Sequence, residues 1–216
     1  MVSHPLILLF YRISGLINLV FSVFRKKTTK NNYENNKNVE LKLEKGFIED
    51  QRQENRLKYG FFTFSHSGCA TAAVFNALLS LGIPEPLPDI ISYFEKRGAS
   101  FYARFGTAPQ AALRLLKKKG LKTKKTASSR RFKEVAESSD VILFTIMNDR
   151  RRLRSMLHTM CIERKAPSSF TVHNSHGKAE TYESYDEMMA SLGDGNGAAS
   201  GVYMIGIDRD QGSEYM

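Results

Sequence analysis

The chain has 216 residues, 42% hydrophobic and 25% charged, which is enough to bury one good core. Its two cysteines lie far apart in the sequence, which predicts free thiols and argues against a disulfide framework. The formal net charge of +10 favours an anionic partner, such as an acidic membrane surface. Nucleic acid is disfavoured, because no stacking aromatic residues are interleaved with the basic runs.

Residues 1–27 form a hydrophobic segment that we expect to be a membrane anchor or an interfacial helix. The apolar run at 5–24 is about long enough to cross a bilayer, but a central Arg12 opposes insertion by on the order of 3 kcal/mol. A cleaved signal peptide fits less well, because no Lys or Arg precedes the run and no small-residue cleavage site follows it. The basic residues at 25–27 would keep a following domain in the cytoplasm if the segment spans; without an anchor, the whole protein is expected to be cytoplasmic.

Residues 28–45 predict a linker, and residues 46–216 predict one folded domain. The linker is rich in Asn and charged residues and has little apolar periodicity, which is typical of a solvated segment.

The first half of the domain is predicted to be helical. An alanine-rich run over 68–81 places Cys69 in the first turn of a buried helix that Gly82 ends. A second helix is expected over 88–97 and a third over 107–120. The expected helix caps are Ser65 or Ser67 for the first helix and a Thr107–Gln110 capping box for the third.

The second half is predicted to be mostly sheet. After a short basic helix over 130–137, apolar runs predict strands at 141–147, 156–163, 170–174 and 202–207. A Ser184–Glu187 capping box predicts a short helix before the last strand. Helices first and strands later indicate an α+β domain with segregated layers.

Cys69 is the candidate nucleophile and His158 its candidate base. A thiol in the first turn of a helix meets unpaired backbone amides and the positive end of the helix dipole, which favour the thiolate. A nearby imidazole completes the ion pair and later protonates the leaving group. Taken alone, a cysteine before an alanine-rich helix is more often a small buried core residue, and a lone strand histidine is usually structural.

Asn174 is the candidate residue that orients the base. If strands 156–163 and 170–174 form a hairpin whose turn is centred on Ala166, His158 lies directly opposite Asn174 and on the same face. The Asn174 amide would then hold one imidazole tautomer. Such a pairing is the second half of a Cys-His-Asn triad.

These stretches resemble the papain-like cysteine peptidase superfamily, and in particular its bacterial branch akin to the bacteriocin leader-processing (double-glycine) peptidases. The resemblance is carried by SGCATAAVFNALLSLG, LHTMCIE and FTVHN and covers about residues 60–207. It implies a papain-like α+β fold, with the Cys helix in the first half and His and Asn on an antiparallel sheet in the second. It also implies catalytic roles for Cys69, His158 and Asn174.

The sequence departs from this family at the oxyanion position. Such enzymes commonly place a Gln six residues before the Cys, where this chain has Thr63. Thr63 and the backbone amide of Cys69 are the remaining candidate donors, and the loss of one donor typically lowers the rate on the order of 100-fold. A weak enzyme or an inactive papain-like module is therefore an open alternative.

Zinc binding is the competing chemical hypothesis. His158 and Cys161 are spaced as H-x2-C, and His173 and His176 as H-x2-H. Residues three apart on a strand point to opposite faces, and the usual Gly-containing knuckle is missing. We therefore predict no metal and no cofactor, and expect Cys161 to be a buried strand residue.

The sequence thus predicts a membrane-associated cysteine hydrolase that cleaves a peptide or isopeptide bond in a peptide or protein substrate. Three alternatives stay open: a catalytically silent peptide-binding module, an acyl or amide transferase with the same triad, and a basic adaptor in which Cys69 is merely core. Basic runs at 117–125 and 150–154 are a possible anionic-substrate or phospholipid patch, though solvated loops are the commoner reading. A glycine-rich stretch at 193–201 is a candidate lid that is more often only a loop.

Overall fold

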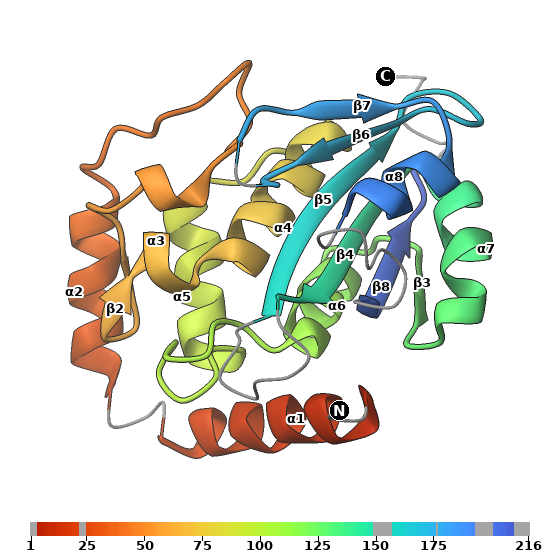
Figure 1. Cartoon of the computed structure of the whole chain (residues 1–216). Helices are drawn as coiled ribbons and strands as arrows, with labels where there is room; N and C mark the ends of the chain where they lie inside the picture. The colour runs from red at the N-terminus through yellow and green to blue at the C-terminus, as the bar shows by residue number, and fades with distance from the viewer. Residues whose placement is uncertain (1–3, 22–24, 149–156, 176, 193–200, 210–216) are drawn as a thin grey trace.

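An antiparallel sheet forms the centre of the molecule (Figure 1). The structure, a computed structural model, describes residues 4–21, 25–148, 157–175, 177–192 and 201–209. Within these residues the sheet has six strands in the order β3-β8-β4-β5-β6-β7, each antiparallel to its neighbours. Its strands are β3 (Thr123–Thr126), β4 (Val141–Met147), β5 (Leu157–Arg164), β6 (Phe170–His173), β7 (Glu180–Tyr182) and β8 (Gly201–Ile207).

Helices cover both faces of this sheet. The chain begins with two helices and a short hairpin, and most of the other helices precede the sheet strands in sequence, as expected for segregated layers. The helices are α1 (His4–Phe21), α2 (Lys26–Asn36), α3 (Phe64–Ser67), α4 (Cys69–Ser80), α5 (Leu87–Arg97), α6 (Pro109–Lys118), α7 (Phe132–Glu137) and α8 (Tyr185–Ser191), and the hairpin is β1 (Lys58–Tyr59) with β2 (Phe62–Thr63).

Side chains alternate between two hydrophobic cores along β5. Cys161 points into the larger core, which α4, α5 and α6 share with one face of the sheet. Met160 and Ile162 point into the second core, on the face that α7 and α8 cover. Because successive strand residues face opposite sides, His158 lies on the same face as Met160. The body of α4 packs on the other face.

The main sequence predictions for the elements are confirmed. The Cys helix is α4, which begins at Cys69 itself, and α5 ends immediately before Gly98. The predicted strands correspond to β4, β5, β6 and β8. The Ser184 cap of α8 is also present, because its side chain accepts a hydrogen bond from the Glu187 amide at 3.1 Å.

The segment predicted as a solvated linker at 28–45 instead starts within α2. This helix has no apolar stripe to reveal it and is held by side-chain amides. Asn32 donates to Glu95 at 2.7 Å, and Asn36 donates to the Lys58 carbonyl at 2.8 Å. Both asparagines are buried, so hydrophobic periodicity carried no signal for this docking.

Two predicted helix caps are wrong. The N-cap of α4 is Gly68, because the serines before it belong to the separate helix α3. The N-cap of α6 is Ala108, and the Thr107 hydroxyl instead contacts the Tyr59 hydroxyl at 2.5 Å. The predicted basic run at 150–154, most of the glycine-rich stretch and His176 lie outside the described residues.

Gly206 gives a test of the packing between β8 and α7. A Cβ atom there would lie 2.0 Å from Ser139 Oγ and 2.9 Å from Val135 Cγ1. We expect Gly206→Ala to destabilise the protein by about 1–3 kcal/mol, because the core has no room for the added methyl group. Denaturant unfolding measures the effect.

The matched control is Gly177→Ala, where a Cβ would meet no atom within 4 Å. Its effect should stay within about 0.5 kcal/mol. Equal stability of the two variants would contradict the described packing.

Candidate active site

The local structure before Cys69 requires a glycine. The short helix α3 ends where the Gly68 amide donates to the Phe64 carbonyl at 2.7 Å. A Cβ on Gly68 would lie 2.6 Å from that same carbonyl oxygen. Only glycine therefore lets α3 turn tightly into α4, which is the physical basis of the Gly-Cys dipeptide.

The Cys69 thiol lies against the main chain of β5. Its side chain is 5% exposed, and Sγ donates to the Leu157 carbonyl at 3.5 Å. The Thr159 amide also hydrogen-bonds to the sulfur. The thiol therefore contacts the two peptide segments on either side of His158.

Burial raises the pKa of the Cys69 thiol. Hydrogen bonds from the amides of Thr159, Ala70 and Cys69 act in the opposite direction but do not outweigh the desolvation. The amides at the start of α4 therefore act in the expected direction, but burial outweighs them. A neutral thiol needs a base to remove its proton before it can attack a substrate.

The His158 ring has a defined tautomer. Its side chain is 3% exposed, and Nε2 lies 2.6 Å from the main-chain carbonyl oxygen of Asn174. A carbonyl only accepts hydrogen bonds, so Nε2 must carry the proton. In the neutral ring the lone pair is then on Nδ1, which is the state a general base requires.

Asn174 contacts His158, but through a different atom and in a different register from those predicted. The hairpin pairs Cys161 with His173, which centres its turn on Pro167 and not on Ala166. His158 is therefore not directly opposite Asn174. The observed register differs from the predicted one by an even number of residues, so His158 and Asn174 still lie on the same face of the hairpin. The hydrogen-bond partner of His158 is the Asn174 carbonyl, and not the predicted side-chain amide.

The Asn174 side chain instead fixes its own backbone. Asn174 has a φ of 62°, in the left-handed region that Asn tolerates better than most residues. Its Oδ1 accepts from the Gln51 amide at 3.1 Å, and its Nδ2 donates to Gln51 Oε1 at 2.7 Å. This two-point contact holds the carbonyl in place for the imidazole.

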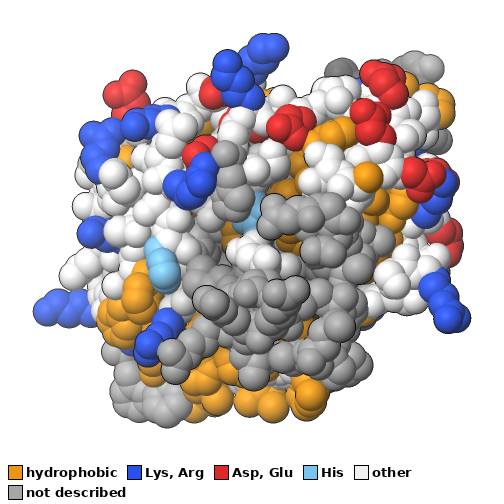
Figure 2. All heavy atoms as spheres, viewed as in Figure 1, with side chains coloured by type: hydrophobic (Ala, Val, Ile, Leu, Met, Phe, Trp, Pro, Cys, Tyr) orange, Lys and Arg blue, Asp and Glu red, His pale blue; other side chains and the backbone are white. Residues whose placement is uncertain are grey.

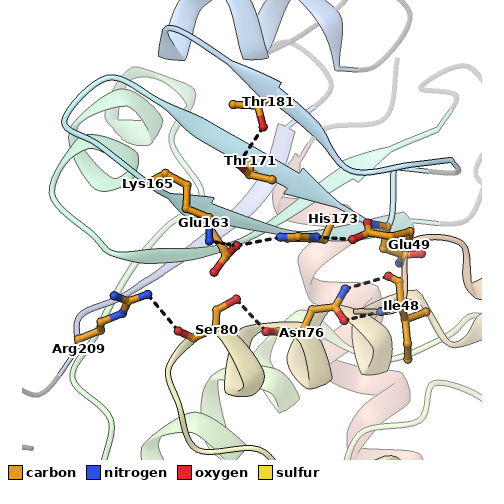
Figure 3. Close-up of polar contacts among 11 residues, drawn as sticks. Ile48, Glu49, Asn76, Ser80, Glu163, Lys165, Thr171, His173, Thr181 and Arg209 are labelled. Atoms are coloured by element: carbon orange, nitrogen blue, oxygen red, sulfur yellow. Dashed lines mark hydrogen bonds and ion pairs between the residues drawn. The ribbon is translucent and has the colours of Figure 1, made fainter. Parts of the chain in front are cut away.

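A buried charged cluster holds the end of β6, next to Asn174 (Figure 3). His173 lies between two carboxylates, with Nδ1 2.6 Å from Glu49 and Nε2 3.0 Å from Glu163. Its ring stacks on Phe47 at 4.1 Å between centroids. Lys165 contacts the same Glu163 oxygen, Oε2, at 2.6 Å. The cluster ties the segment before Gln51 to β5 and β6.

Two opposing effects set the pKa values in this cluster. Burial alone would lower the pKa of His173, but hydrogen bonds to Glu163 and Glu49 outweigh it and raise the pKa. Burial alone would raise the pKa of Glu163, but hydrogen bonds from His173 and Lys165 lower it to about 2. A charged His173 between two carboxylates is therefore favoured at pH values below the usual histidine pKa of about 6.5.

The Thr63 hydroxyl contacts Ser65, which differs from the expected role of Thr63 as an oxyanion donor beside the thiol. It caps α3, and its hydroxyl lies 2.9 Å from Ser65 Oγ. The backbone amides of Thr159, Ala70 and Cys69 are the groups that reach the sulfur. Main-chain amides at the start of α4 are thus better placed than Thr63 to meet a developing negative charge.

Helix α1 covers the end of the sheet at which β5 begins. Tyr11 is buried, its hydroxyl oxygen accepts a hydrogen bond from the Leu157 amide, and it is close enough to Cys69 for the two to interact electrostatically. Ile7 and Tyr11 pack with Met147, Leu157 and Val202 in a third small core. Tyr11 and the thiol therefore both contact the main chain of Leu157, Tyr11 at the amide and Cys69 at the carbonyl.

The three described residues of the zinc hypothesis do not all lie on one face of the sheet. Cys161 pairs with His173 on the α4 face, whereas His158 is on the other face. Both ring nitrogens of His173 contact carboxylates. Within the described residues, no group of three or more His, Cys, Asp or Glu side chains is arranged to hold a metal ion.

Comparison of the chain with protein-family models and with curated proteins finds no match.

Sequence reasoning missed Tyr11, Glu49 and Gln51. Glu49 and Gln51 stand in a polar stretch near the start of the domain and contact residues more than 120 positions away. Nothing in their local pattern indicates that contact. Tyr11 is one aromatic residue within an apolar run. The sequence does not indicate which face of that helix is buried, and only the tertiary structure shows that Tyr11 lies on it.

Replacement of His173 should give a pH-dependent loss of stability. A raised His173 pKa contributes stability that is fully present below the unfolded value of about 6.5 and is lost as pH rises through the folded value. The lowered Glu163 pKa contributes stability above about 4.5 that is lost toward pH 2. We expect His173→Gln to destabilise by about 3 kcal/mol near pH 5.5, and by less at pH 9.

Denaturant unfolding across pH measures this difference. Lys165→Gln is the matched control, because Lys165 contacts the same carboxylate from the exposed side and its loss should cost about 1 kcal/mol or less. A destabilisation by His173→Gln that does not vary with pH would contradict a charged His173.

Proposed function

We propose that the chain is a papain-like cysteine hydrolase acting on a peptide or isopeptide bond, with its catalytic residues in the domain at 46–216. The observation that carries the proposal is the His158 contact: Nε2 donates to the Asn174 carbonyl, and the Cys69 thiol contacts the main chain on both sides of His158. These contacts support a scheme in which Cys69 is the nucleophile, His158 is the base and Asn174 orients the base.

In the proposed reaction, His158 Nδ1 takes the proton from the Cys69 thiol as sulfur attacks the substrate carbonyl carbon. The amides of Cys69 and Ala70 stabilise the negative oxygen of the tetrahedral intermediate. The C–N bond then breaks, and His158 gives its proton to the leaving amine, so a thioester remains. Water, deprotonated by His158, attacks the thioester and releases a carboxylic acid and the thiol.

Asn174 has a positioning role in this scheme. Its carbonyl stabilises the imidazolium that forms when Nδ1 accepts the proton, because the Nε2–H bond becomes charge-assisted. Gln51 contributes through its contacts with the Asn174 side chain.

A second candidate function is a catalytically silent peptide-binding module. The Thr63 hydroxyl is engaged with Ser65, and burial raises the Cys69 pKa. Both features lower the reactivity of the site and favour binding without turnover.

Acylation by p-nitrophenyl acetate, followed by intact mass and peptide mapping, separates the two functions. We expect one acetyl group on Cys69 of the full chain, and none there in Cys69→Ala. His158→Gln keeps a donor for the Asn174 carbonyl but lacks the base, so acylation should slow by about 100-fold or more. Tyr11→Ala opens space beside the thiol and should speed acylation.

Cys161→Ala is the matched control, since Cys161 is a fully buried core residue whose pKa burial raises well above its usual range. Its removal should leave acylation unchanged. If neither the native chain nor Tyr11→Ala is acylated on Cys69, or if His158→Gln reacts at the native rate, the hydrolase proposal fails and the silent module is favoured.

A further inference from the structure

Helix α1 has an apolar face that the domain does not cover. Its other face is buried, where Ile7 and Tyr11 pack on the sheet and Ser14 contacts Ser100. The outward face spans about a third of the helix circumference at 100° per residue. Seven large apolar side chains on it are 37% to 67% exposed: Leu6, Leu9, Phe10, Ile13, Leu16, Ile17 and Val20.

The apolar surface continues onto the loop beside α1. The Phe10 ring stacks on Phe101 at 5.8 Å, and Phe101 is itself 37% exposed. Three successive residues of this loop, Phe101, Tyr102 and Ala103, have positive φ values of 43°, 62° and 73°. In Figure 2, hydrophobic side chains gather along the lower edge of the molecule, where Figure 1 places α1.

Cationic residues flank this apolar face. A groove beside α1 is lined by Arg12, Arg97 and Arg114, together with Tyr11 and Leu16. A second groove on the same helix adds Lys125 to Arg12 and Arg114. None of the described residues that line these two grooves is acidic. An exposed apolar helix is therefore bordered by positively charged side chains.

We propose that α1 and its flanking arginines form a docking surface for an anionic lipid bilayer. An interfacial helix buries its apolar side at the boundary between headgroups and acyl chains, while neighbouring basic side chains meet lipid phosphates. The positive border and the net charge of +10 fit such a surface. Within the described parts of the chain, no helix has the length and hydropathy needed to cross a bilayer.

Charge also argues against a second copy as the occupant. A two-fold dimer through α1 would place the same surface patch of both copies together. The Arg12, Arg97 and Arg114 side chains of one copy would then approach those of the other, and like charges at an interface are unfavourable. An anionic bilayer meets the same cations with opposite charge.

Vesicle co-sedimentation with the full chain tests this surface. We expect binding to vesicles of phosphatidylcholine with phosphatidylglycerol, weak binding to phosphatidylcholine alone, and release at high salt. Ile13→Glu should weaken partitioning at least about tenfold, because it places a charge in the apolar contact. Arg114→Gln should weaken it about fivefold for the loss of one cation.

The matched control is Ile83→Glu, which changes an apolar side chain of similar exposure, 41%, on the loop after α4. It should bind vesicles like the native chain, and thermal unfolding of each variant confirms that it folds. The proposal is overturned by equal binding to neutral vesicles, by native binding of Ile13→Glu, or by a dimer that Ile13→Glu disrupts without any vesicle binding.

Discussion

The hydrogen bond from His158 Nε2 to the Asn174 carbonyl is the interaction on which the functional account depends. At 2.6 Å, it sets the tautomer of a buried imidazole and so decides which nitrogen can act as a base. A main-chain carbonyl is a fixed acceptor only if the backbone around it is fixed. The left-handed conformation of Asn174 and its contacts with Gln51 provide that rigidity. The orientation of the base therefore rests on residues far from it in sequence.

Buried polar contacts connect the early part of the domain to the sheet. Glu49 contacts His173, and the neighbouring Gln51 contacts Asn174, so one short segment supports the end of β6 twice. Such networks are stabilising only when every member is satisfied, because an unpaired buried charge is costly. At the start of β5, Tyr11 of α1 accepts a hydrogen bond from the Leu157 amide, and Cys69 contacts the carbonyl of the same residue. The proposed membrane-docking helix thus lies beside the proposed nucleophile.

Local patterns in the sequence predicted the parts of the fold that depend on local chemistry. The apolar runs identified α4 and the central strands, and the Gly-Cys dipeptide placed Cys69 at the start of its helix. The hairpin register was wrong by an even number of residues, so the face of His158 was predicted correctly while its partner atom was not. The docking of α2 through Asn32 and Asn36, and the roles of Glu49 and Gln51, had no periodic signal because they are long-range polar contacts.

The most direct test of the central claim is the tautomer of His158, observed in long-range ¹H–¹⁵N spectra of the folded full chain, with His158→Gln used to assign the ring. The account predicts a neutral ring whose proton is on Nε2, with Nδ1 showing the shift of an unprotonated nitrogen. A His158 ring protonated on Nδ1 alone would contradict the account, because Nε2 would then have no proton to donate to Asn174 and Nδ1 no lone pair to accept the thiol proton.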